Sequence, residues 1–337
     1  MVRFSRFVIV VVASCLLVRS LHAQPFYLPT ANRAIYEPGG EDKFFAPTPG
    51  KTWTSGCFGC VRSDGHQLHE GLDIRAIQRD KRDEPTDPVM ASADGTVAYI
   101  NSRPSLSNYG NYIVLRHQID GLDIYTLYAH LKEIGAGLKV GQTVKTGQVI
   151  AIMGRTSNTA ETITKDRAHV HFEIDLVASD HFSAWYKKFN PGERNDHGDW
   201  NGQNLMGIDP RLILLQEHSQ TNFSLLNFIR TKTTLCRVFV RVTDFSYLRR
   251  YPQLVLPNPR AQKEGVVGYE IALDFNGVPC ELIPRSAAEI PGKPRFQLLS
   301  VNETEEAANP CRRLVVQRGG RWELANNGNN LLELLTY

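Results

Sequence analysis

Two pairs of potential metal ligands lie in short segments that are typical of β-strands. His169 and His171, in AHVHFEI, are two residues apart in an alternating run, so their imidazoles project from the same face of a strand. The segment HEGLDI supplies His69 and Asp73, whose Cα atoms would lie about 13 Å apart in a fully extended chain. Gly71 lies between them and permits a bulge or bend that brings their side chains together. The two segments together predict a metal site.

A further histidine, His130, ends the run DIYTLYAHL. Strand alternation places Thr126, Tyr128 and His130 on one face, which we expect to border a groove. A set of nitrogen and oxygen donors suits zinc, held by three protein ligands with one position open for water. Zinc activates water and polarises a carbonyl, and spare histidines move protons or stabilise the tetrahedral intermediate. The reaction that fits these side chains is amide hydrolysis.

The N-terminal segment has the composition of a secretory signal. Two arginines precede an apolar run over 7–18, and small residues before the end of the segment predict cleavage after Ala23. The run is too short to cross a bilayer. A lipid anchor at Cys15 is the alternative, which we disfavour because the apolar run continues past that cysteine. We therefore expect a signal peptide at 1–23 and a periplasmic or extracellular protein.

The charge balance excludes one class of partner. Removing 1–23 takes away three arginines and no acids, so Lys+Arg falls from 38 to 38 − 3 = 35 against 35 Asp+Glu. The net charge of the mature chain is then near zero, which gives no reason to expect nucleic acid as a partner. We also expect no membrane-spanning segment after the signal is removed, and the oligomeric state is left open.

Five cysteines remain after such a cleavage, and an oxidising compartment favours their pairing. Cys57 and Cys60 form a Cys-x-x-Cys motif. We interpret it as a local disulfide that closes a small loop, because no βαβ pattern surrounds it. Cys236, Cys280 and Cys311 lie in the last third of the chain. Any two of these three can pair and leave one over.

The distribution of apolar runs and turn signals predicts a mostly β protein with two domains. Residues 24–52 are rich in Pro and Gly and predict an extended lead-in. Residues 53–216 alternate short apolar runs with turn signals, which predicts an antiparallel β domain. Residues 221–337 predict a smaller β-rich domain whose role no motif reveals. Two long polar stretches interrupt the first domain, a charged one at 78–88 and an aromatic one at 179–204, and the second is suited to wall a groove.

Across about 53–215, the chain resembles the lysostaphin-type, LytM-like zinc metallopeptidases, which cut peptide cross-links in bacterial peptidoglycan. The resemblance rests on linked segments in a fixed order rather than on one histidine motif. These segments are HEGLDI, PVMASADGTV, YGNYIVLRH, DGLDIYTLYAHL, KVGQTVKTGQVIAIMGRTSNT, AHVHFEI and GIDPRLIL. The resemblance implies an antiparallel β-sheet peptidase domain with an active-site groove, and peptidoglycan peptides as the substrate.

The resemblance also implies roles for five residues. His69, Asp73 and His171 would be the zinc ligands, and His130 and His169 the catalytic pair. All five are present, unlike in degenerate members of the family that have lost ligands. Two other functions stay open. One is a zinc peptidase that acts on secreted proteins or peptides, and the other is a non-catalytic regulator that binds the cell wall.

The chain departs from the usual pattern of these peptidases at three places. The segment 161–166 lengthens the approach to the second histidine motif, and the polar stretches at 78–88 and 179–204 are longer than the usual connections. We expect all three to border the groove, where they would affect substrate specificity more than chemistry.

Overall fold

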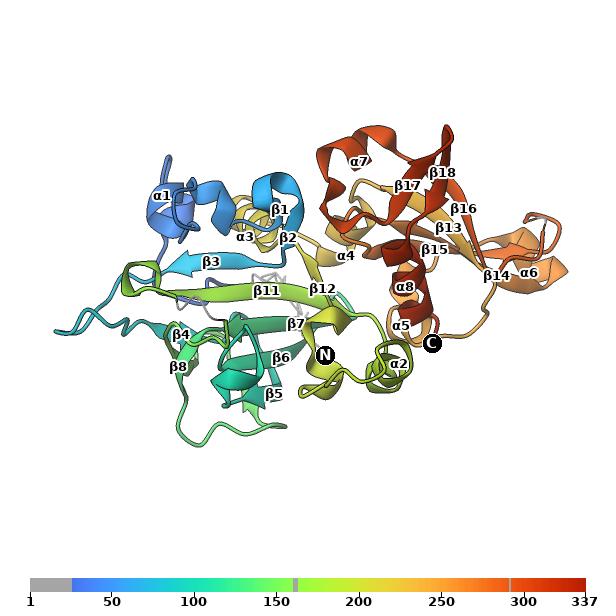
Figure 1. The fold of residues 1–337 in the computed structure, drawn as a ribbon. Helices are drawn as coiled ribbons and strands as arrows, with labels where there is room; N and C mark the ends of the chain where they lie inside the picture. The colour runs from blue at the N-terminus through green and yellow to red at the C-terminus, as the bar shows by residue number, and fades with distance from the viewer. Residues whose placement is uncertain (1–25, 160–162, 291) are drawn as a thin grey trace, which may run out of the picture.

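A computed structural model describes residues 26–159, 163–290 and 292–337. The expected signal peptide at 1–23 and the alternative lipid site at Cys15 lie outside these residues. Within the described part of the chain, none of the helices has both the length and the apolar character needed to cross a membrane. Figure 1 shows a mostly β molecule built from antiparallel sheets, as the sequence predicted.

The largest sheet has seven strands and carries Asp73, His169 and His171. Its order is β12-β11-β7-β6-β5-β9, and β3 pairs with the first half of β11 while β12 pairs with the second half. The strands are β3 (Leu72–Arg75), β5 (Gly95–Asn101), β6 (Tyr112–Ile119), β7 (Leu122–Ala129), β9 (Thr143–Val144), β11 (His169–Val177) and β12 (Leu205–Ile208). All of these pairings are antiparallel. The apolar runs of the sequence therefore become the central strands β6, β7 and β11.

Two smaller sheets and three helices accompany the large one. The first sheet has the order β4-β10-β8, and the second is the hairpin β1-β2. Their strands are β1 (Gly59–Arg62), β2 (Gln67–His69), β4 (Pro88–Met90), β8 (Leu131–Ile134) and β10 (Val149–Met153). The helices are α1 (Glu41–Phe44), α2 (Phe182–Phe189) and α3 (Pro210–Ser219). The segment before β1 packs on the sheet, since Phe26, Phe44 and Phe45 are buried.

The two faces of β11 have different environments. Val170, Phe172 and alternate residues beyond them join the main hydrophobic core. His171 and Glu173 lie on the opposite face. A small second hydrophobic cluster lies on that face, and it includes Leu127 of the neighbouring β7 and residues of β6 and β12. Because both faces are covered, every residue of β11 is buried.

The sequence assigned the wrong face of β7 to the groove. Thr126 and Tyr128 are fully buried and hydrogen-bonded to each other on the core side. His130 nevertheless reaches the site face, because it follows the end of β7 with a left-handed backbone, φ 59°. This conformation breaks the strand alternation and turns the imidazole to the other side of the sheet.

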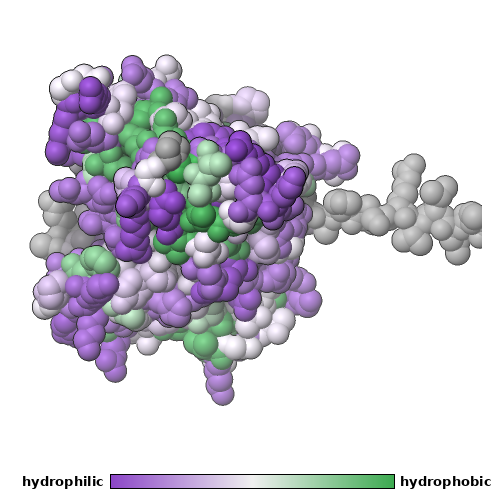
Figure 2. Space-filling model, turned by 90° about the vertical axis from the view of Figure 1, so that its right-hand side faces the viewer, coloured by the Kyte–Doolittle hydropathy of each residue, from purple (hydrophilic) through white to green (hydrophobic). Residues whose placement is uncertain are grey.

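The C-terminal part of the chain has its own four-stranded sheet, of order β15-β14-β13-β16, and a separate hairpin. The strands are β13 (Cys236–Val240), β14 (Val266–Leu273), β15 (Pro279–Ser286), β16 (Phe296–Val301), β17 (Val315–Arg318) and β18 (Arg321–Leu324). The helices are α4 (Leu225–Arg230), α5 (Ser246–Arg250), α6 (Pro259–Glu264), α7 (Glu303–Ala308) and α8 (Asn326–Leu335). On the face drawn in Figure 2, hydrophilic and hydrophobic side chains are interspersed.

Specific contacts fix this C-terminal sheet against the large one. The hydroxyl of Tyr251 accepts a hydrogen bond from the backbone N–H of Val177 at 2.8 Å. The amide of Asn276 donates to the carbonyl of Gly207, also at 2.8 Å. One contiguous hydrophobic cluster includes buried residues of both sheets. The two parts of the chain are therefore packed as neighbours rather than joined only by a linker.

The cysteine pairing differs from both predictions. Cys60 is bonded to Cys311, across 251 residues of sequence. Cys57, Cys236 and Cys280 are free, so the local Cys57–Cys60 disulfide and the pairing within the C-terminal third were both wrong. The reason is tertiary: the β1-β2 hairpin packs against the short helix Pro310–Arg312, and this packing brings two distant cysteines together.

One histidine of β6, His117, is buried with 1% exposure. Burial lowers its pKa from 6.5 to about 4. The unfolded chain therefore binds a proton that the folded chain does not, and we expect the free energy of unfolding to fall as pH is lowered from about 6.5 to about 4, by up to ~3 kcal/mol. Urea unfolding across this range checks the expectation. His117→Gln should flatten the dependence, whereas the exposed His66→Gln should leave it unchanged.

Candidate metal centre

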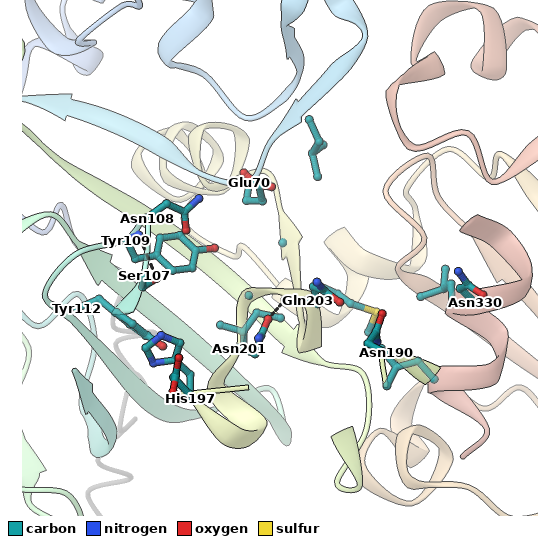
Figure 3. A pocket seen from close by; sticks show the side chains of 18 of the residues that line it. Glu70, Ser107, Asn108, Tyr109, Tyr112, Asn190, His197, Asn201, Gln203 and Asn330 are labelled. Atoms are coloured by element: carbon teal, nitrogen blue, oxygen red, sulfur yellow. Dashed lines mark hydrogen bonds between the residues drawn. The ribbon is translucent and has the colours of Figure 1, made fainter. Parts of the chain in front are cut away.

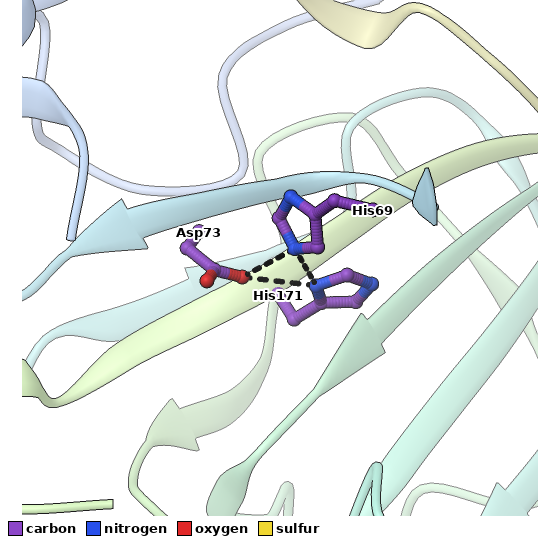
Figure 4. A group of neighbouring side chains, drawn as sticks. All are labelled: His69, Asp73 and His171. Atoms are coloured by element: carbon purple, nitrogen blue, oxygen red, sulfur yellow. Dashed lines mark hydrogen bonds and ion pairs between the residues drawn. The ribbon is translucent and has the colours of Figure 1, made fainter. Parts of the chain in front are cut away.

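Three side chains from three strands converge on one point. His69 ends β2, Asp73 lies in β3, and His171 lies in β11. His69 Nε2 and His171 Nδ1 each lie 3.0 Å from Asp73 Oδ1, and the two nitrogens are 3.1 Å apart. Figure 4 shows the resulting triangle. Ligands about 2.0 Å from a tetrahedral zinc ion would be ~3.3 Å apart. The donor set and its spacing therefore fit a zinc ion with little rearrangement.

The strand register explains how the chain assembles this triangle. Asp73 lies opposite His171 in the antiparallel β3-β11 pair. Between β2 and β3 the chain turns at Gly71, where a Cβ atom would lie 2.3 Å from the carbonyl oxygen of Phe172. Only glycine allows this close approach to β11. The interruption that the sequence predicted at Gly71 is thus present, and it brings His69 next to Asp73.

Hydrogen bonds fix which nitrogen of each imidazole faces the triangle. His69 Nδ1 lies 2.7 Å from the carbonyl oxygen of Cys57, which leaves Nε2 for a metal. His171 Nε2 lies 2.7 Å from Glu173 Oε1, which leaves Nδ1. Arg62 donates to the other oxygen of Asp73 at 2.5 Å. The acceptors orient the two imidazoles and raise their basicity, and Arg62 holds the carboxylate in position.

His130 and His169 lie beside the triangle, close to each other, with their ring centres 4.8 Å apart. His130 Nδ1 is 2.8 Å from the carbonyl oxygen of Thr156, and His169 Nδ1 is 2.6 Å from that of Arg167. Each imidazole therefore donates to the backbone through Nδ1, which leaves Nε2 of His130 able to accept a proton, whereas Nε2 of His169 lies 3.4 Å from Asp73 Oδ1. The structure brings together all five residues singled out from the sequence.

The burial of this cluster sets its charge state. Burial opposes the charge of Asp73, but interactions with neighbouring imidazoles outweigh it and hold the pKa well below its usual range. Burial likewise opposes protonation of His171, yet hydrogen bonds to Asp73 and Glu173 raise its pKa to about 10. For His130, burial and the nearby histidines lower the pKa well below the usual value. A neutral His130 therefore lies beside a ligand group that carries a proton until a metal displaces it.

Three supporting residues were not found from the sequence. Glu173 holds His171 and accepts a further hydrogen bond from the hydroxyl of Tyr109 at 2.7 Å. Arg62 holds Asp73. Strand alternation does place Glu173 on the face of His171, so the sequence contained a signal for this residue. It contained none for Arg62, which comes from a different hairpin.

We expect Glu173→Gln to weaken zinc binding about 10- to 100-fold, because the amide is a weaker acceptor for the His171 Nε2–H and does not stabilise charge on the ring. Competition with a colorimetric zinc chelator measures the affinity. Glu133→Gln, at an exposed position of β8, is the matched control and should bind zinc as the parent does. Equal affinities in the two variants would contradict the role given to Glu173.

Cavities flank the cluster on two sides. One, of about 750 Å³, is lined by His69, Arg62 and residues of the segment before β1. The other, of about 670 Å³, extends from Tyr109 toward α8. Glu70 lines both. Figure 3 shows the second cavity, with Glu70 above it and Asn330 of α8 on the far side.

The polar stretches of the sequence differ in their relation to these cavities. The aromatic stretch 179–204 lines the second cavity through Trp185, His197 and several amide side chains, as predicted. The charged stretch 78–88 lines neither cavity. Its Glu84 forms an ion pair with Arg155 at 3.0 Å, and the expectation that this stretch borders the groove stays a prediction.

Comparisons with known proteins agree with this site. The model of peptidase family M23 matches residues 67–182. The lipoprotein NlpD of Yersinia enterocolitica is 32% identical over 87 residues, which are 26% of this chain and 75% of that protein. The peptidoglycan DD-endopeptidase ShyB of Vibrio cholerae is 36% identical over 88 residues, which are 26% of this chain and 17% of that protein. This chain belongs to peptidase family M23, which is zinc-dependent.

Among solved structures, the catalytic domain of lysostaphin from Staphylococcus simulans is 21% identical and covers 48% of this chain and 87% of its own, with a TM-score of 0.29. A TM-score at this level adds no argument about the fold. The chain spans 18%, 18% and 29% of the lengths of the first three curated relatives it matches. The family assignment therefore describes the segment around the metal centre rather than the whole chain.

Proposed function

We propose that this chain is an exported zinc endopeptidase that hydrolyses peptide bonds in the stem or bridge peptides of peptidoglycan. The observation that carries the proposal is the triangle of His69, Asp73 and His171 with two further histidines beside it. The family match and the relative named as a peptidoglycan endopeptidase support it. Residues 53–216 would form the peptidase domain and 221–337 a second domain, with a signal peptide at 1–23.

In this proposal, His69, Asp73 and His171 hold zinc, which activates water and polarises the scissile carbonyl when it is bound. His130 accepts a proton at Nε2, because its Nδ1–H is already donated to Thr156. His169 is also held through Nδ1, and it would donate to the oxygen that gains charge in the tetrahedral intermediate once its Nε2 carries a proton. The buried cluster excludes bulk water, which strengthens these electrostatic interactions.

Incubation of the purified protein with intact peptidoglycan, followed by mass spectrometry of the released fragments, tests the function. New amino termini without new reducing sugar ends are the expected result, and their masses locate the scissile bond. Cleavage of secreted proteins alone would identify a peptidase with another substrate. Retention on peptidoglycan without cleavage would identify a wall-binding regulator. Both of these outcomes would overturn the proposal.

The pH dependence of turnover tests the role of His130. A proton acceptor must be neutral, and burial lowers the pKa of His130, so this residue stays neutral to lower pH than an exposed imidazole does. We therefore expect kcat/KM in zinc-saturated buffer to hold as pH falls through about 6.5 and to decline only at more acidic pH. A decline centred near 6.5 would indicate that an exposed histidine is the acceptor.

A further inference from the structure

The cavity that extends from Tyr109 to α8 is lined by an unusual number of side-chain amides. It lies between the site face of the large sheet and the C-terminal helix, and it holds about 670 Å³ (Figure 3). The amides are Asn108, Asn158, Asn190, Asn201, Gln203, Asn276, Asn327 and Asn330. Each offers both a donor and an acceptor, the two functions that pair with the amide groups of a peptide.

Four charged side chains line the same cavity: Glu70, Arg194, Asp196 and Arg312. Arg194 and Asp196 form an ion pair at 2.6 Å and balance each other. The guanidinium of Arg312 makes no hydrogen bond or ion pair to any described residue, and its Nε is shielded from solvent without a partner. Burial lowers the pKa of Arg312 by more than the carboxylates of Glu70 and Asp274 raise it. A partly buried guanidinium without a hydrogen-bond partner favours an anionic ligand.

The protein holds Arg312 in place from two sides. The preceding residue, Cys311, is bonded to Cys60 of β1, the hairpin whose other strand carries the ligand His69. The carbonyl of Arg312 accepts a hydrogen bond from the side chain of Asn327 in α8 at 3.0 Å. The backbone of Arg312 therefore has a position set by both the metal-bearing hairpin and the C-terminal helix. A fixed backbone limits the region that the guanidinium can reach.

We propose that Arg312 binds a carboxylate of the peptide substrate. The C-terminal region then forms the side of the cleft that determines which peptides bind. This inference rests on the proposed peptidase function. A guanidinium pairs with a carboxylate through two parallel hydrogen bonds, which fixes orientation as well as position. The surrounding amides hold the neutral backbone of the same peptide. One fixed cation near the metal centre then determines which bond of a carboxylate-bearing peptide reaches the metal.

The test measures binding rather than turnover. Soluble stem peptides from peptidoglycan are prepared with free carboxylates and, separately, with their carboxylates converted to methylamides. Each preparation is titrated calorimetrically into the zinc-loaded full chain carrying His130→Asn, in which cleavage is expected to be slow. We expect the free carboxylates to bind about 10- to 100-fold more tightly than the methylamides. Adding Arg312→Gln should remove this difference, and adding Arg313→Gln, at the neighbouring exposed arginine, should preserve it.

Several results would overturn the inference. One is an equal loss of affinity for both peptide forms when Arg312→Gln is added. A second is a preference for the free carboxylates that Arg312→Gln leaves unchanged. The third is that neither peptide form binds to the protein that retains Arg312. Thermal melting and an intact Cys60–Cys311 bond verify that the variants are folded. Cleavage by the parent chain is assayed separately. A carboxylate preference that depends on Arg312, without cleavage, would refute the proposed function alone, and cleavage without that preference would refute this inference alone.

Discussion

His171→Ala is expected to reduce bound zinc from about one ion per chain to a small fraction and to abolish peptidoglycan cleavage. The substitution removes Nδ1, one of three donors, and leaves the carboxylate of Glu173 buried without its imidazole partner. Loss of even a supporting contact weakens metal sites about 10- to 100-fold, so loss of a ligand should cost at least ~100-fold. Elemental analysis after dialysis against a weak chelator measures the retained zinc.

Thermal melting supplies a second readout for the same variant. A ligand that binds only the folded state stabilises it, so added zinc should raise the Tm of the parent and not that of the His171→Ala protein. His181→Ala, at an exposed histidine outside the cluster, is the control and should respond as the parent does. Undiminished zinc in the His171→Ala protein would show that this residue is not a ligand.

His130 substitutions are expected to separate metal binding from catalysis. Loss of the proton acceptor should lower kcat about 10²- to 10⁴-fold, while about one zinc per chain remains bound. His130→Asn is the better variant, because His130 has φ 59° and asparagine tolerates this left-handed conformation more readily than alanine does. Rates of fragment release from peptidoglycan, measured alongside zinc content, provide the test.

The outcome of this comparison discriminates between two roles. A variant that keeps zinc and loses turnover supports proton transfer by His130. A variant that loses zinc and turnover together would make His130 a ligand or a structural support. Unchanged turnover with full zinc would transfer the role of proton acceptor to His169, the other histidine beside the triangle.

The sequence predicted the site well where local periodicity determines geometry. The spacing of His169 and His171 holds because β11 is a regular strand, and Gly71 marks the turn that brings His69 to Asp73. His130 was placed beside the site for the wrong reason. Its backbone leaves the strand geometry after residue 129, and alternation cannot anticipate a left-handed residue.

Long-range packing is what the sequence did not reveal. Cys311 reaches Cys60 from a region that showed no functional motif. Most of the C-terminal helices were also missed, including α8, which lines the cleft. Contacts between elements far apart in sequence depend on how the faces of whole sheets and helices pack together. The periodicity of a short sequence segment does not predict that packing.

The Cys60–Cys311 bond has a consequence for the order in which the chain matures. During synthesis, Cys60 emerges 251 residues before its partner, while Cys57 is already beside it. Thiols exchange with disulfides through mixed intermediates, so any bond that Cys57 formed with Cys60 in this interval would have to be reopened when Cys311 arrives. The hairpin that carries His69 therefore reaches its final covalent state only after nearly the whole chain has been synthesised.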